Sequence, residues 1–129
     1  MEIVLRREQP EQRQFVYLRL TPDRTLVYTA GRKAMRNENP QERPTWRGTV
    51  PPEVYQDLVS MARAARAAEG VEAAASMPTY RLVVINEGEL FPGELVGGPS
   101  PALDELYRRL VRVQTDARAE ELDPARLPR

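Results

Sequence analysis

The sequence contains no histidine and no cysteine. A chain without these residues has no Ser-His-Asp triad, no thiol nucleophile and no zinc site built on imidazole or thiolate ligands. It also lacks the side chain whose pKa best suits proton transfer near neutral pH. We therefore expect no catalytic centre of the common kinds, no metal and no cofactor, and the composition leans away from an enzyme.

Long apolar runs are also missing. No stretch approaches the roughly 18 uncharged apolar residues of a membrane span. The first seven residues, MEIVLRR, do not show the basic and then apolar order of a secretory signal. Because disulfides are also absent, these features predict a soluble protein of the cytoplasm, although a trimmed secreted chain would look the same.

Charge of one sign is not in excess, because 19 basic residues balance 19 acidic ones. Residues 1–50 carry ten basic and six acidic side chains, which falls short of the basic stripe of a nucleic-acid-binding protein. Lys33 is the only lysine, and the preference for Arg, Ala and Pro is more typical of a GC-rich bacterial genome than of a function. A solvated Lys33 is favoured over a Schiff-base lysine, because the surrounding sequence is polar.

A β-hairpin is the clearest local pattern. Residues 15–20 and 25–30 are rich in β-branched and aromatic side chains, and the sequence TPDR between them suits a type I turn. With Pro22 and Asp23 at the turn centre, Tyr17 would lie opposite Tyr28 and Leu18 opposite Val27.

Further strands are predicted on both sides of this hairpin. Residues 3–5 read as a short strand followed by a polar segment, and residues 46–50 as another short strand. Residues 80–85 are almost continuously apolar, which is typical of an interior strand. Residues 90–96 would pair with them, and Pro92 places this strand at an edge of the sheet because proline cannot donate to a ladder.

Two amphipathic helices complete the pattern. The first begins at Pro51 and Pro52 and should end near Gly70, and the second begins with Ser100 as N-cap and Pro101 at the first helical position. On the second helix, charged pairs at i,i+4 spacing would lie on the outer face. The apolar stripes of both helices are Val54, Leu58, Met61, Ala65, Leu103, Leu106, Leu110, Val113 and Ala117.

The order of elements is therefore β-β-β-(β)-α-β-β-α, which predicts the α+β class. We expect a mostly antiparallel sheet of about five or six strands with two helices packed on one face. In that arrangement the helices would meet either Leu82 and Val84 or Val83 and Ile85. Residues 1–122 would form a single globular domain, and residues 123–129 a frayed tail.

The segment of residues 31–44 is a long polar loop with two prolines, a kind of loop that is often functional or mobile. Arg36 and Arg43, with Trp46 nearby, resemble a basic loop beside an aromatic platform for single-stranded nucleic acid. The alternative, a mobile polar loop with Trp46 packed in the core, is favoured, and we regard nucleic acid as a disfavoured partner.

Three classes of function remain. The leading hypothesis is a non-catalytic accessory or protein-interaction domain (a subunit, an adaptor or an inhibitor-like binder) that binds another protein or itself. The second is weak binding of single-stranded nucleic acid through residues 31–47. The third is a carboxylate-dependent enzyme that uses Glu87, Glu89 or Glu94. The candidate partner-binding residues lie in or beside the loop and on the edge strand: Arg36, Arg43, Trp46, Leu90 and Phe91.

Overall fold

The computed structural model describes residues 1–35, 38–40, 42, 44–67, 77–85 and 94–121. It contains one six-stranded sheet and two helices, in the chain order that the sequence predicts. The strands are β1 (Glu2–Gln9), β2 (Gln14–Leu20), β3 (Thr25–Ala30), β4 (Trp46–Thr49), β5 (Thr79–Ile85) and β6 (Leu95–Gly97). The helices are α1 (Pro52–Ala67) and α2 (Pro101–Glu121), and two short 3-10 turns are η1 (Pro10–Gln12) and η2 (Gly31–Ala34).

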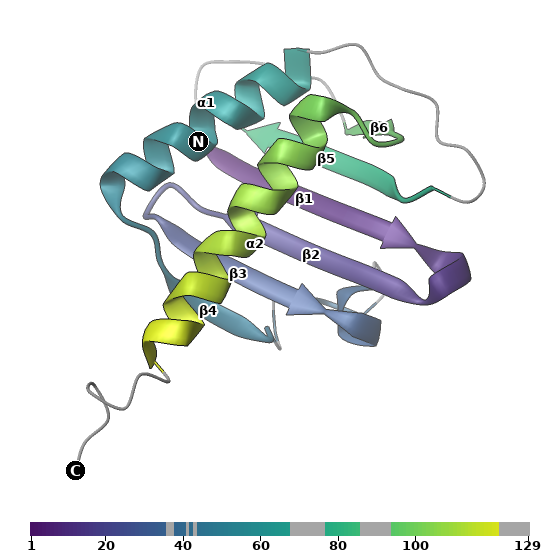
Figure 1. The fold of residues 1–129 in the computed structure, drawn as a ribbon, viewed down its shortest axis with the longest axis horizontal. Helices are drawn as coiled ribbons and strands as arrows, with labels where there is room; N and C mark the ends of the chain where they lie inside the picture. Colours follow the sequence, from purple (N-terminus) through teal and green to yellow (C-terminus); the bar gives the residue numbers. More distant parts are fainter. Residues whose placement is uncertain (36–37, 41, 43, 68–76, 86–93, 122–129) are drawn as a thin grey trace.

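Every strand pairing is antiparallel, and the strand order is β4-β3-β2-β1-β5-β6. The α+β prediction is therefore confirmed. Both helices cover the same face of the sheet, which α2 crosses diagonally (Figure 1). β5 occupies an interior position, as its apolar run predicts, and β6 lies at the edge of the sheet. Of the strand expected over residues 90–96, β6 covers only Leu95–Gly97, and residues 90–93, with Pro92, lie outside the described residues.

β1 is longer than predicted, because the polar residues after Leu5 continue the strand as far as Gln9. β1 lies between β2 and β5, and its backbone groups bond to both neighbours along this stretch. Its polar side chains alternate between the two faces of the sheet, as in any strand. The expectation of a short strand over residues 3–5 was wrong, because a run of polar residues is typical of a loop and the sequence does not show that its backbone pairs on both sides.

The register of the β2–β3 hairpin also differs from the prediction by one residue. Leu18 lies opposite Tyr28, and Leu20 opposite Leu26. The expected turn forms, since the amide of Arg24 donates to the carbonyl of Thr21 at 2.9 Å. Arg24 then adopts a left-handed conformation with φ of 68°, which adds a third residue to the loop and shifts the pairing.

The two helices share one core with the sheet. Leu82 and Val84 face this core, whereas Val83 and Ile85 lie on the opposite face. The helices contribute buried side chains at helical spacing, and Met61 lies partly buried at the margin. These side chains are Leu58, Ala62 and Ala65 from α1 and Leu103, Leu106 and Leu110 from α2.

The N-terminus of α2 is capped as predicted, because the amide of Leu103 donates to Ser100 Oγ at 3.2 Å. The i,i+4 pair of Arg112 and Asp116 forms, with a nitrogen–oxygen distance of 3.6 Å. Arg109 forms an ion pair with Asp57 on α1, with a nitrogen–oxygen distance of 3.8 Å.

Neither α1 nor α2, the two helices in the described ranges, has a stretch long and apolar enough to cross a bilayer.

Candidate interaction surface

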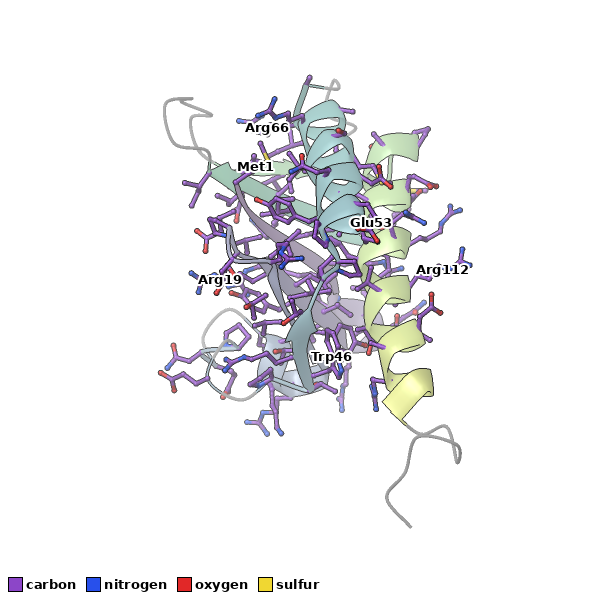
Figure 2. The ribbon with its side chains drawn as sticks, turned by 90° about the vertical axis from the view of Figure 1, so that its left-hand side faces the viewer. Met1, Arg19, Trp46, Glu53, Arg66 and Arg112 are labelled. Atoms are coloured by element: carbon purple, nitrogen blue, oxygen red, sulfur yellow. The ribbon has the colours of Figure 1, made fainter. Side chains whose placement is uncertain are left out.

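The face of the sheet that the helices leave uncovered carries an alternating set of charged and apolar side chains. The register places Arg6, Arg19 and Arg81 on this face, together with Glu2 and Glu8. Figure 2 shows Arg19 on the side of the sheet away from the helices, with Arg112 on the outer side of α2. We call this surface the open face.

Ion pairs neutralise the charges near the middle of the open face. Arg19 Nε donates to Glu2 Oε1 at 2.6 Å. Arg81 lies between Glu8, with which it forms an ion pair, and Glu94 of the segment before β6, at 3.1 Å. Burial lowers the pKa of Arg81, but the hydrogen bonds to the two glutamates outweigh it and raise that pKa overall. Such paired arginines are poor ligands for a phosphate backbone.

The η2 segment covers the open face above β2 and β3. Ala34 is buried against Tyr17 and Val27 and forms a small second core with them. The guanidinium of Arg6 lies 4.8 Å from the ring centroid of Tyr17 and donates to the carbonyl of Ala34 at 3.4 Å. Burial raises the pKa of Tyr17. Part of the predicted polar loop is therefore docked on the sheet.

The other end of the open face, over β1, β5 and β6, remains exposed. Ile85 and Val96 are 54% and 47% exposed, which is unusual for large apolar side chains of a strand. Val83 lies opposite Val4 on β1, and both are partly buried. We call Val4, Val83, Ile85 and Val96 the open-face patch.

β6 forms the rim of this patch. Among the described residues no strand pairs with the outer side of β6, whose inner side bonds to β5. An edge of this kind presents backbone donors and acceptors that a partner strand can use. Val96 points to the open face opposite Arg81, so an added strand would contact both its backbone and the patch.

Of the five candidate residues from the sequence, the structure describes only Trp46. Its indole is 8% exposed and packs in the main core, as the favoured alternative states, so it offers no stacking surface in this structure. The ring also covers Gly48, because a Cβ built there would overlap Cζ2 and Cη2 of the indole. The remaining candidates, Arg36, Arg43, Leu90 and Phe91, lie outside the described residues.

Of the three glutamates in the carboxylate hypothesis, the structure describes only Glu94. Glu94 is engaged with Arg81, while Glu87 and Glu89 lie outside the described residues. Within the described ranges, no three acidic side chains are grouped so that they could hold a metal ion. Lys33 is exposed.

The open-face patch and its ion pairs were missed from the sequence. The alternation of Arg6 and Glu8 with the residues between them was the available signal, because a period of two continues through the polar segment. That signal places side chains on a face, but it does not show that β5 lies next to β1.

No protein-family model matches the chain, and a comparison with curated proteins finds no significant relative, so its own residues must carry any functional argument.

Proposed function

We propose that this chain is a non-catalytic protein-interaction domain whose partner docks on β6 and the open-face patch. The observation that carries this proposal is the exposure of Ile85 and Val96 beside an edge strand. A subunit, an adaptor and an inhibitor-like binder are versions of the same function, and the partner is another protein or a second copy of the chain.

The chemistry of the patch favours a partner segment in extended conformation. Backbone hydrogen bonds to β6 would provide affinity. Separate apolar side chains would provide selectivity, one against Val96 and another against Ile85, because Ile85 lies four residues along β5 from Arg81, the residue opposite Val96. Burial of a valine or isoleucine side chain contributes about 1.5–3 kcal/mol when complete, and less here because each is half-exposed at the start. The partner must therefore contact more than the patch to form a stable complex.

Nucleic-acid binding through residues 31–47 has less support. It requires an accessible aromatic platform, and Trp46 is buried in the core. On the open face, Arg19 and Arg81 are already held by glutamates. Salt-dependent retention of a single-stranded RNA or DNA at low ionic strength would reverse this preference.

The test is affinity capture from the native host with three immobilised forms of the chain: wild type, Val96→Glu and Gln56→Glu. A glutamate at position 96 lies opposite Arg81, so the sheet should accept it. Gln56→Glu adds the same charge at an exposed position on α1 and is the matched control.

We expect wild type and Gln56→Glu to retain the same stoichiometric partner and Val96→Glu to retain at least about tenfold less, since a charge would enter an apolar contact. Light scattering over a concentration series distinguishes a foreign partner from a second copy. Failure to recover any stoichiometric partner, with a monomer at every concentration, would contradict the proposal.

A further inference from the structure

A recess lies between the β1–β2 connection and the η2 segment. It has a volume of about 330 Å³ and is lined by Pro10, Arg13, Phe15, Arg32 and Met35. This volume is at the lower end of the range for small-molecule sites, roughly 300–1,000 Å³. The recess therefore accommodates one compact group and not a long ligand.

Both walls of the recess are held by their own backbone hydrogen bonds. The amide of Arg13 donates to the carbonyl of Pro10 at 3.0 Å, and Arg13 has a left-handed φ of 53°. On the other side, the amide of Met35 donates to the carbonyl of Arg32 at 3.1 Å. Ala34, between them, is buried against the sheet. The backbone on both sides of the recess is therefore held by local hydrogen bonds.

The two arginines of the recess differ from those on the rest of the open face. Arg19 and Arg81 are paired with glutamates, whereas Arg13 and Arg32 form no ion pair with any residue that the structure describes. Among the residues that the structure describes, no acidic side chain lines the recess. Within the described part of the chain, the recess therefore combines two guanidinium groups that have no carboxylate partner with an apolar wall.

We propose that this recess binds a carboxylate attached to one apolar group of about the size of an aromatic side chain. Phe15 and Met35 would contact the apolar group, because a thioether and an aromatic ring adapt to such a shape. Arg13 and Arg32 would hold the carboxylate, for which the planar fork of arginine is well suited. The carboxylate belongs either to a free organic acid or to the C-terminal residue of a peptide.

The first experiment compares two probes of nearly the same shape, one ending in a carboxylate and the other in a neutral amide. N-acetyl-phenylalanine and N-acetyl-phenylalaninamide are titrated into the ¹⁵N-labelled full chain, and amide shifts are followed by NMR. We expect the acid to move the signals of Arg13, Phe15 and Arg32, and the amide to bind about tenfold more weakly because it lacks the charge-assisted hydrogen bonds. Equal binding of both probes, or no shift at either, would overturn the proposal.

The second experiment tests the arginines themselves. The double variant Arg13→Gln/Arg32→Gln should lose the preference for the acid, while Arg108→Gln/Arg112→Gln on α2 removes the same total charge and should keep it. Loss of the preference in both variants would show a general charge effect and overturn the site. Stronger binding of a tripeptide that ends in phenylalanine than of 3-phenylpropionate identifies a peptide terminus, and the reverse order identifies a free acid.

This inference does not depend on the proposed protein partner. The recess and the open-face patch share no residue, so a failed capture experiment leaves the probe titrations unaffected.

Discussion

Replacement of Leu106 by alanine tests whether α2 and the sheet share one core. Leu106 is a fully buried residue of α2, and it belongs to the cluster that also contains side chains of α1 and of the sheet. The substitution removes three carbons at about 0.8 kcal/mol each, and the cavity left behind adds to this loss. Because packed elements lie on both sides and limit collapse, we expect a loss of about 3–4 kcal/mol in the free energy of unfolding.

Arg109→Ala is the matched change on the other side of α2. The Arg109 side chain is 37% exposed, and its distance of 3.8 Å from the mostly exposed Asp57 describes a weak surface pair. Its loss should cost well under about 1 kcal/mol. Urea denaturation followed by circular dichroism separates the two variants, because a loss of 3 kcal/mol lowers the midpoint by about 1–3 M. Small, similar losses for both variants would refute the shared core and indicate that the stripe of α2 faces a partner.

Three further changes have defined outcomes. Gly48→Ala should destabilise the protein by about 1–3 kcal/mol, because its methyl group overlaps the buried indole of Trp46; unchanged thermal unfolding, followed by the fluorescence of this single tryptophan, would contradict that packing. Arg13→Gly should instead raise stability by about 0.5–1 kcal/mol, because glycine adopts the left-handed φ of 53° without strain, and a lower melting temperature would count against this conformation. Burial, with the hydrogen bond to Asp104, raises the pKa of Tyr80 from 10.0 to about 12. The unfolded chain releases this proton at a lower pH than the folded chain does. The contribution of Tyr80 to the free energy of unfolding is therefore complete below pH 10 and is lost as the pH rises toward 12. Tyr80→Phe should therefore flatten the fall in urea midpoint between pH 10 and pH 12, and an unchanged slope would assign that fall to other groups.

Much of the fold was accessible from periodicity and turn chemistry. The stripes of α1 and α2 and the cap at Ser100 depend on residues close together in the chain, and the structure confirms them. The hairpin register was not accessible, because it depends on a left-handed conformation at Arg24, a type of residue that seldom adopts it. The choice between the two faces of β5 likewise required the sheet order, which periodicity does not contain.

The candidate surface was less accessible than the fold. The strand at the edge of the sheet was predicted, since β6 lies there, but Pro92 itself lies outside the described residues. The open-face patch, however, depends on the pairing of β1 with β5, which places Val4 opposite Val83 although the two strands are distant in the sequence. The burial of Trp46 was favoured, but the sequence could not establish it. A tryptophan beside a basic loop has the same sequence pattern whether its ring is buried or exposed to a ligand.

The strand order has a consequence for synthesis of the chain. β1 is made before the other five strands but lies inside the sheet, and its partner β5 follows about 70 residues later. At about 5–20 residues per second, one side of β1 stays unpaired on the ribosome for roughly 4–15 s. During this interval β1 can accept β5 from a neighbouring nascent chain, and the exchange would produce a domain-swapped dimer. Slow translation of residues 10–78 should therefore increase the swapped dimer, whereas dilution of the nascent chains should suppress it.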